Sequence, residues 1–383
     1  MSVALVTNYL PPYRLPLYEL LAERLGVEVF CFGGEGSYVP QALRDLEVQL
    51  ANARFPAHRL ARQRDARDLA ERHEAVIASV AGRVALPAAY AGARRSGRPF
   101  VLWASLWRHP RTPAHLLSFA LMRRMYRRAD AILTYGPHVS RYVAKVRGRE
   151  DDVIVAPQAV EQDLFARVVG EDEIAAWRDV LKLPDGPLVL FVGRLAKEKG
   201  IGTLLKAWRR VHRHGEAALC VVGNGPLRAE RAFFDEPGVR LAGRVPRESL
   251  PVAYAAADVV VVPSIATRGF IEPWGLVCNE AMSQGRAVIA TDAVGAAAGG
   301  LVRDDETGVV VPAGDARSLA DSIERLLDDA ALRERLGREA KRAVGDYDYE
   351  HAADAFARAL HLAREQGRAQ ERPVSRPASA ERP

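Results

Sequence analysis

The feature that most constrains the fold is a repeated alternation of short apolar segments with amphipathic helical ones. In the first half, the apolar segments cover residues 3–7, 27–32, 75–79, 99–105, 131–135 and 153–157. In the second half, they cover residues 187–193, 218–225, 239–243, 258–264, 287–291 and 308–312. Because these runs are continuously apolar, both faces of each strand should be covered by helices. The alternation predicts an α/β fold of βαβ units with two mostly parallel sheets.

The polar segment at 160–177 contains no strand pattern and separates the two series. We therefore predict two doubly wound, Rossmann-like domains facing a central cleft, one at 1–170 and one at 171–345. A C-terminal helix is expected at 346–366, packing back toward the N-terminal domain. Residues 367–383 are rich in Pro, Arg and Ala and nearly free of large apolar residues, so we expect them to be disordered.

In open α/β sheets, ligands bind beyond the carboxyl ends of the strands, so the loops that follow strands are the places to search. The loop in FVGRLAKEKG follows a strand that ends at Gly193 and carries Arg194 and Lys199 before a helix. Two cations and a helix start suit a diphosphate. The alternative is a pair of solvated cations on a surface loop. A P-loop is excluded, because GxxxxGK[ST] is absent.

The stretch EPWGLVCNEAMSQG, residues 272–285, carries Glu272 and Glu280 eight positions apart. We expect Pro273-Trp274-Gly275 to open a helix. The amides of Gly275 and Leu276 would then lie at its N-terminus, where an anion is favoured. Both carboxylates can accept hydrogen bonds from ligand hydroxyls. The alternative for Glu280 is an acid on the helix surface.

The segments GRLAKEKG, VVGNGPLR, ADVVVVPS and EPWGLVCNEAMSQGRAVIATDAVG resemble the group 1 glycosyltransferases, the retaining family 4 enzymes of the GT-B fold. Glu272 and Glu280 match the E-x7-E signature of that family. The resemblance is strong over about residues 185–345. The N-terminal half resembles the family only in its architecture and in scattered motifs.

The resemblance implies that the domain at 1–170 binds the acceptor and the domain at 171–345 binds the donor. It also implies a role for each matching residue. Arg194 and Lys199 would hold the donor diphosphate and stabilise its leaving charge. Glu280 would bind the ribose hydroxyls, and Glu272 would contact the transferred sugar. The amides of Gly275 and Leu276 would lie near sugar and phosphate. The remaining residues that we assign to the donor site are Gly193, Trp274 and the base-edge pair Arg244 and Val245.

The chain departs from the family pattern on the acceptor side. NYLPPYR, residues 8–14, replaces the usual glycine-rich loop after the first strand, so we assign Asn8, Tyr13 and Arg14 to the acceptor side. The family often has a histidine near the C6 hydroxyl of the sugar, and His109 is the candidate here. His115 and His138 are the other candidates. Trp274 stands where the family usually has Phe.

Positive charge is concentrated between Arg54 and Arg149, where twenty Lys and Arg residues face only five acids. Such a segment attracts anionic partners, including lipid headgroups, nucleic acid and phosphorylated substrates. LMRRMYRRAD, residues 121–130, has the pattern of a basic amphipathic helix, as membrane-peripheral enzymes use. The alternative is a helix packed on the sheet with solvated arginines. The predicted membrane patch consists of Arg123, Arg124, Arg127 and Arg128.

Metal chemistry has little support in the sequence. Cys31, Cys220 and Cys278 lie in apolar contexts without a CxxC pair, which favours buried thiols in a reducing compartment. DYD, residues 346–348, resembles a DxD metal motif but lies between helices, so we interpret it as a helix cap and turn. The resemblance implies that Arg and Lys neutralise the diphosphate. We therefore predict no metal and no cofactor.

Together these patterns predict a retaining glycosyltransferase that moves a sugar from a nucleotide-diphosphate sugar to a saccharide or lipid-linked acceptor. We expect a role in cell-envelope polysaccharide or glycolipid synthesis. The expected location is cytoplasmic, at the inner face of the plasma membrane, with no nucleic-acid partner. The alternatives are another GT-B enzyme, such as a nucleotide-sugar epimerase or a phosphorylase, and a non-catalytic basic binding protein.

Overall fold

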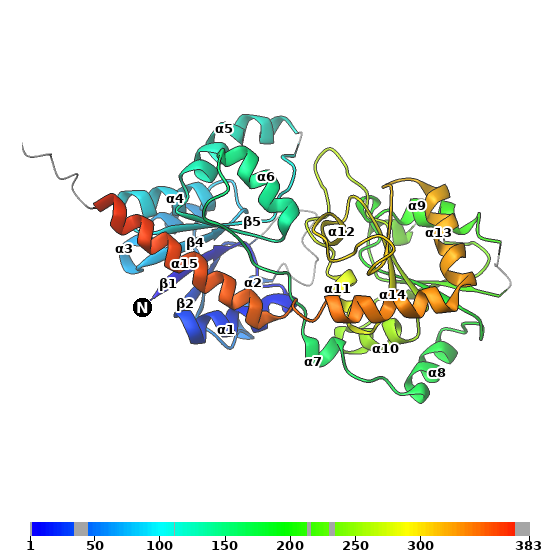
Figure 1. Ribbon diagram of the computed structural model, residues 1–383. Coiled ribbons are helices and arrows are strands. Elements are labelled where there is room, and N and C mark those ends of the chain that lie inside the picture. The colour runs from blue at the N-terminus through cyan, green and yellow to red at the C-terminus, as the bar shows by residue number, and fades with distance from the viewer. Residues whose placement is uncertain (1, 34–44, 111, 213–215, 230–233, 372–383) are drawn as a thin grey trace, which may run out of the picture.

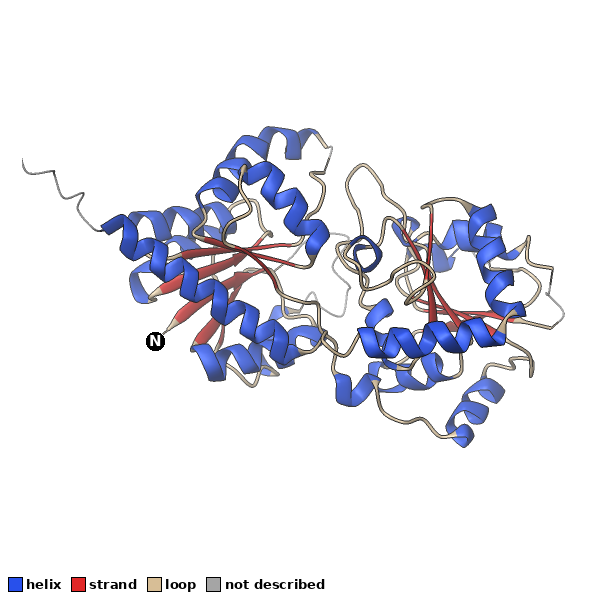
Figure 2. Cartoon of the chain, in the orientation of Figure 1, coloured by secondary structure: helices blue, strands red, loops and turns tan. Residues whose placement is uncertain are grey.

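The structure is a computed structural model that describes residues 2–33, 45–110, 112–212, 216–229 and 234–371. It contains two parallel sheets, one in each half of the chain, with helices on both faces of each (Figures 1 and 2). The α/β architecture that the sequence predicted is therefore confirmed.

The first sheet has seven strands in the order β3-β2-β1-β4-β5-β6-β7, and each of these strands runs parallel to its neighbours. The strands Val3–Thr7 and Phe100–Ala104 are buried along their whole length, in keeping with their apolar sequences. The strands are β1 (Val3–Thr7), β2 (Val27–Cys31), β3 (Ala57–Arg59), β4 (Ala75–Ser79), β5 (Phe100–Ala104), β6 (Ala131–Thr134) and β7 (Val153–Val155).

Six helices accompany this sheet in the described part of residues 2–155. They are α1 (Leu15–Leu25), α2 (Leu46–Ala51), α3 (Leu69–Arg72), α4 (Ala85–Arg95), α5 (Pro113–Arg128) and α6 (Pro137–Arg147). Proline stands in the first turn of α1, α5 and α6, where its missing N–H has no helical partner to lose.

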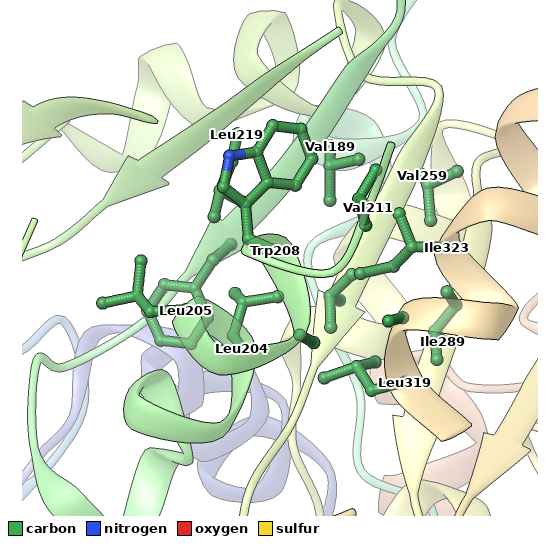
Figure 3. Close-up of a cluster of buried hydrophobic side chains, with 14 of the residues drawn as sticks. Val189, Leu204, Leu205, Trp208, Val211, Leu219, Val259, Ile289, Leu319 and Ile323 are labelled. Atoms are coloured by element: carbon green, nitrogen blue, oxygen red, sulfur yellow. The ribbon is translucent and has the colours of Figure 1, made fainter. Parts of the chain in front are cut away.

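The second sheet has six strands in the order β10-β9-β8-β11-β12-β13, all parallel. The strands are β8 (Leu188–Val192), β9 (Ala218–Val222), β10 (Val239–Gly243), β11 (Val259–Val262), β12 (Ala287–Thr291) and β13 (Val309–Val311). Trp208 anchors the core on one face of this sheet (Figure 3), where its indole N–H donates to the Pro237 carbonyl at 2.9 Å.

Two of the helices around the second sheet, those that start at Ala316 and Ala330, begin at aspartate caps. Asp315 accepts hydrogen bonds from Arg317 N at 2.9 Å and Ser318 N at 3.1 Å, and Asp329 accepts one from Leu332 N at 2.8 Å. The helices are α7 (Gln162–Phe165), α8 (Glu171–Val180), α9 (Ile201–Trp208), α10 (Leu250–Ala255), α11 (Val277–Ser283), α12 (Gly295–Ala298), α13 (Ala316–Asp328) and α14 (Ala330–Ala343).

The last helix, α15 (Tyr349–Glu371), lies along the first half of the chain rather than the second (Figure 1). Phe356 and Leu360 join the core beside β5, and the Phe356 ring meets Trp103 edge-on at 5.0 Å. Asp348 caps the helix by accepting from His351 N at 2.8 Å. DYD is thus a helix cap, as expected.

The predicted end of this helix is wrong by five residues. The structure continues α15 to Glu371, so residues 367–371 are helical rather than disordered. Arg368, Ala369, Gln370 and Glu371 all favour helix, and the first proline comes only at Pro373. Residues 372–383, for which disorder was also predicted, lie outside the described residues.

Candidate active site

The candidate site forms at the carboxyl edge of the second sheet, where the loops that follow β8 and β11 meet. Lys199 pairs with the carboxylate of Glu272, and Ser264 Oγ donates to the same carboxylate at 3.1 Å. Glu272 is 7% exposed, so these partners replace most of the water that would solvate its charge. The structure thus joins Lys199 and Glu272, which the sequence places in one site.

Arg194 lies on the same loop as Lys199. Its guanidinium pairs with Glu198 in the short 3-10 turn Lys197–Lys199. The backbone oxygen of Glu198 accepts from Ile265 N at 2.9 Å, which ties the loop after β8 to the loop after β11. Both candidate cations therefore have a carboxylate partner here, so a bound anion would compete with Glu198 and Glu272 for them.

The tight packing of these two loops depends on Gly200. Its φ is +71°, and a Cβ atom there would lie 1.7 Å from the Pro263 carbonyl oxygen. Any residue with a side chain at this position would push the two loops apart. The glycine therefore holds Lys199 within reach of Glu272.

The predicted start of the helix after Glu272 is wrong. Pro273-Trp274-Gly275 does not open it, and α11 begins at Val277 with Leu276 as its N-cap. The reason is Gly275, whose φ of +92° is incompatible with a right-handed helical turn. The amides of Gly275 and Leu276 thus lie in the loop that leads into the helix.

Trp274 is buried within the second half of the chain. It is 3% exposed, its indole N–H donates to Asn279 Oδ1 at 2.7 Å, and its ring stacks on Tyr347 at 5.6 Å. Asn279 in turn donates to the Gln158 backbone oxygen at 2.8 Å. The indole N–H thus has a hydrogen-bond partner. Phenylalanine, which the family usually has at this position, has no N–H to donate.

Glu280 lies in α11, where its carboxylate accepts a hydrogen bond from the Tyr254 hydroxyl at 2.5 Å. Burial raises the pKa of Glu280, while the Tyr254 hydrogen bond and the charge of Arg247 oppose that rise. Burial also raises the pKa of Tyr254, so its hydroxyl stays protonated and donates. Glu280 is thus a partly enclosed acceptor and not a freely solvated surface acid.

The ends of β8, β9 and β10 come together through backbone contacts. Gly193 N donates to the Val222 oxygen at 3.0 Å, and Gly223 N donates to the Gly243 oxygen at 2.7 Å. Next along this edge, Arg244 is exposed and Val245 packs partly buried on the core. The structure places Gly193, Arg244 and Val245 at the same sheet edge as Lys199, and their ligand roles stay predictions.

His109 and His115 interact with each other at the start of α5. His109 Nε2 donates to the His115 backbone oxygen at 2.8 Å, and its ring packs on Phe119 at 4.6 Å. His115 Nδ1 lies 2.6 Å from Thr112 Oγ1. Among the described contacts, none joins His109 to Glu272, and its predicted role near the sugar stays a prediction.

His138 connects the two halves of the chain directly. It is 3% exposed, and its Nε2 donates to the Pro273 carbonyl oxygen at 3.0 Å. Trp107 lies beside it and donates from Nε1 to the Glu272 carbonyl oxygen at 3.1 Å. Burial lowers the pKa of His138 to about 4, and the charge of Arg141 adds to that effect. Its ring is therefore neutral near neutral pH.

The residues predicted for the acceptor side lie beyond the carboxyl end of β1. The Arg14 guanidinium lies 4.4 Å from the centre of the Trp103 ring and bonds to the Tyr135 hydroxyl. The Tyr13 backbone oxygen accepts from Tyr349 of α15 at 2.8 Å, and Asn8 Oδ1 accepts from Thr7 Oγ1 at 3.5 Å. The structure thus fixes Arg14 among aromatic rings.

The four predicted membrane-patch arginines lie in the second half of α5, which packs beside α6 (Figure 1). Arg123 and Arg127 line a cavity between these helices, whereas Arg124 and Arg128 do not line it. All four side chains are exposed. Met125 and Tyr126, which alternate with these arginines in the predicted amphipathic helix, are buried in the core of the first half.

The cysteines and acids of the described residues do not assemble into a metal-binding group of three or more. Cys278 lies in α11 between the two glutamates, and burial raises the pKa of its thiol well above the ordinary range. A thiol held in that state is a poor nucleophile. In the described part of the chain, no helix is both long and apolar enough to cross a bilayer.

Comparison with known proteins identifies the class to which the second half belongs. Residues 173–343 match the family model described as "Glycosyl transferases group 1". This segment is therefore a group 1 glycosyltransferase domain, as its motifs predicted.

Two curated relatives extend the match. An alpha-D-kanosaminyltransferase of Streptomyces kanamyceticus is 34% identical over 184 residues, which are 46% of each chain. A D-inositol 3-phosphate glycosyltransferase of Xylanimonas cellulosilytica is 34% identical over 244 residues, or 60% of this chain and 56% of that protein. The chain thus spans about half the length of the curated relatives it matches.

Solved structures cover nearly the whole fold. HepE of Anabaena, in complex with UDP and glucose, matches with a TM-score of 0.75 at 18% identity, covering 94% of this chain and 99% of that one. WaaG, a glycosyltransferase involved in lipopolysaccharide biosynthesis, matches with a TM-score of 0.64 at 17% identity, covering 92% and 98%. Together with the two parallel sheets, these likenesses confirm the GT-B fold.

Three side chains of the site escaped the sequence analysis. Ser264 lies two residues after the end of β11, and its place after a strand end was the one signal that pointed to it. Tyr254 lies within an apolar helix and gave no signal. Trp107 was recognisable only as an aromatic in the loop after β5, because its partner is a backbone oxygen from a distant part of the sequence.

Proposed function

We propose that this protein is a retaining glycosyltransferase that uses a nucleotide-diphosphate sugar as donor. The observation that carries the proposal is the pairing of Lys199 with the buried Glu272, beside Arg194, at the carboxyl edge of the second sheet. Both cations lie on one loop, as a diphosphate would need, and a carboxylate suited to sugar hydroxyls adjoins them. Names of relatives and the UDP-bound HepE structure support a nucleotide-sugar donor.

The assigned roles follow from the contacts. On donor binding, the diphosphate would take over Lys199 and Arg194 from their carboxylate partners. Glu272, freed from part of that pairing, would then accept from the sugar hydroxyls. Glu280 would accept from the ribose hydroxyls with the Tyr254 hydroxyl holding its other side. The two cations would then carry the charge of the leaving diphosphate, with no metal required.

We propose front-face transfer as the chemical step. The acceptor hydroxyl oxygen bonds to the anomeric carbon on the face from which the diphosphate leaves. The bond between that carbon and the phosphate oxygen breaks, and the acceptor proton passes to the leaving phosphate. Positioning and electrostatic stabilisation supply most of the rate, because the side chains do no covalent chemistry.

We propose a saccharide or lipid-linked acceptor, handled at the anionic inner face of a membrane in envelope polysaccharide or glycolipid synthesis. In α5, Leu116 and Leu117 are 62% and 86% exposed, beside the four arginines. Exposed leucines next to arginines suit an interfacial helix. Relatives named phosphatidyl-myo-inositol mannosyltransferase and sulfoquinovosyl transferase support a lipid-linked acceptor.

Calorimetry with UDP, GDP and ADP tests the donor site. We expect one nucleotide to bind, and Lys199→Ala and Glu280→Ala each to weaken it by about tenfold or more, through loss of charge-assisted hydrogen bonds. Lys206→Ala, on the neighbouring helix α9, is the matched control and should leave the affinity unchanged. Equal affinities in all four proteins would refute the donor-site assignment.

A product assay separates transfer from the alternatives. Incubation with the donor sugar should release nucleoside diphosphate only when an acceptor is present. Release of an epimerised sugar, or a requirement for phosphate as the second substrate, would favour another GT-B reaction. Wild-type cellular activity of Glu272→Ala, combined with strongly salt-dependent nucleic-acid binding, would favour a basic binding protein.

A further inference from the structure

A cavity of about 780 Å³ lies between α5 and α6, and we call it the α5–α6 cavity. Five of its lining side chains are cations, namely Arg108, Arg123, Arg127, Arg141 and Lys145. They come from both helices and from the loop after β5. Five cations around one cavity repel one another unless an anion lies among them.

The described residues offer no carboxylate partner for this charge. Among the described residues, no acid forms an ion pair with any of the five cations. In the described part of the chain, Arg108 and Arg141 donate to backbone oxygens, those of Thr267 at 3.3 Å and Ala298 at 3.0 Å. The one acid in residues 99–149 is Asp130, which is buried and bonded to Arg94 and Phe100 N.

The remaining walls are largely aromatic. Trp107, Phe119, His138 and Tyr142 line the cavity beside the cations. Flat ring faces of this kind suit the apolar face of a sugar or polyol that carries the anion.

The cavity adjoins the candidate active site. Trp107 and His138, which line it, are the side chains that bond to the backbone oxygens of Glu272 and Pro273. Ala298, from the second half of the chain, lines it as well. The side chains of Trp107 and His138 therefore lie between a ligand in the cavity and the loop that carries Glu272.

We propose that the α5–α6 cavity binds a phosphate group of the acceptor, so that the acceptor is a phosphate-bearing molecule. This inference rests on the proposed glycosyltransferase function and narrows its acceptor class. The phosphate belongs either to a soluble phosphomonoester or to a lipid headgroup, since both present the same anion to Arg123, Arg127 and Lys145. Arginine provides the planar donor pair that phosphate oxygens accept.

Two binding measurements on the full chain identify the source of the phosphate. In calorimetry, glucose 6-phosphate should bind and glucose should not. In flotation, vesicles of phosphatidylglycerol should carry the protein and vesicles of phosphatidylcholine should not. Binding in the first assay assigns a soluble acceptor, and binding in the second alone assigns a lipid headgroup. Absence of binding in both overturns the proposal.

A matched pair of double variants tests whether the cavity is responsible. Arg123→Gln/Arg127→Gln removes two lining cations, and Arg124→Gln/Arg128→Gln removes the same charge from the same helix outside the cavity. The first should weaken binding by about tenfold or more, and the second by less than about twofold. Equal loss in both would mean a general basic surface and would overturn the proposal. Circular dichroism checks that both variants are folded.

Nucleotide binding separates this inference from the proposed function. Arg123→Gln/Arg127→Gln should leave the affinity for nucleoside diphosphate unchanged, and Lys199→Ala should leave the affinity for glucose 6-phosphate or vesicles unchanged. If neither glucose 6-phosphate nor the vesicles bind while nucleotide binding depends on Lys199, only the cavity assignment is refuted. If nucleotide fails to bind, the proposed function falls, whatever the phosphate probes do.

Discussion

His138 Nε2 lies 3.0 Å from the carbonyl oxygen of Pro273, so a buried histidine of the first sheet's half bonds to the residue that follows Glu272. The neutral ring donates this bond, since Nε2 must carry its proton to face a carbonyl. Protonation of the second nitrogen would bury a charge, because Nδ1 has no partner among the described residues. This contact makes the junction between the two halves sensitive to acid.

The first prediction concerns stability below neutral pH. The pKa of His138 is about 4 in the folded chain and about 6.5 in an unfolded one. Between these values the unfolded state binds more protons, so the free energy of unfolding should fall as the pH drops from about 6.5 to about 4, by at most about 3 kcal/mol. Urea unfolding at successive pH values measures this loss.

His138→Gln should remove that part of the pH dependence. His361→Gln is the control, because His361 is 73% exposed in α15. The same steep loss of stability in wild type and His138→Gln would contradict the prediction.

The second prediction concerns the loop that enters α11. Gly275 has a φ of +92°, and a Cβ there would lie 2.9 Å from Val294 Cγ1. Gly300 has a similar φ of +87° but nothing within 4 Å of such a Cβ. Gly300→Ala should therefore lower the free energy of unfolding by the backbone strain alone, about 1 kcal/mol. Gly275→Ala should lower it by about 1 kcal/mol more. Denaturant unfolding of the two variants compares them directly.

Gly275→Ala should also weaken nucleotide binding, because the loop carries Glu272, whereas Gly300→Ala should not. Equal unfolding free energies in the two variants would show that the Val294 contact relaxes without cost.

The third prediction concerns Glu280, whose pKa is raised above its ordinary value by burial. At a pH between the unfolded and the folded pKa, such a carboxyl keeps its proton in the folded protein and loses it in the unfolded chain. The free energy of unfolding should therefore fall as the pH rises from about 4.5 toward the raised pKa. Glu280→Gln removes this titration and keeps an oxygen for the Tyr254 hydroxyl, so its stability relative to wild type should improve over that interval.

The same Glu280→Gln variant should bind nucleoside diphosphate more weakly, which would make Glu280 a site residue held at a cost to stability. Glu23→Gln, at an exposed position of α1, provides the reference for thermal unfolding at each pH. A Glu280→Gln curve parallel to wild type across pH 4.5 to 7 would be inconsistent with a raised pKa in the folded protein.

The fourth prediction concerns the exposed leucines of α5. Leu117 is 86% exposed and Leu121 is 44% exposed, one helical turn apart. Leu117→Gln/Leu121→Gln should lower the partition onto phosphatidylglycerol vesicles by about tenfold or more, because each leucine loses the free energy of entering the bilayer boundary. Vesicle flotation measures the partition.

Val168→Gln/Val180→Gln is the matched control for that experiment. Val168 and Val180 are 92% and 81% exposed, and both lie in or near α8, away from α5. Equal vesicle binding by the two double variants would rule out α5 as the interfacial helix.

The sequence predicted most strands of both sheets because each is a continuous apolar run whose pattern depends only on local residues. It missed the true start of α11, since the residue types around Gly275 do not show that this glycine takes a left-handed conformation. It predicted all four arginines of α5 as one patch. Only the packing of α5 on α6 separates Arg123 and Arg127, which line the cavity, from Arg124 and Arg128.

The site was predictable to the extent that its residues follow strands. Lys199 and Glu272 lie in such loops, and the structure joins them. The partners that enclose them were not predictable in the same way. Trp107 and His138 bond to backbone oxygens more than 130 positions away. Every residue has a backbone oxygen, so the residue types at those positions do not reveal the hydrogen bonds.

The position of α15 has a consequence for biosynthesis. Phe356 and Leu360 complete the core on one face of the first sheet, next to Trp103. While the ribosome is still making the second half, that face has no cover, and its apolar strands are open to chaperones and to misassembly. The segment containing β8–β13 is finished earlier. The half that is translated first should therefore be the last to reach its native state.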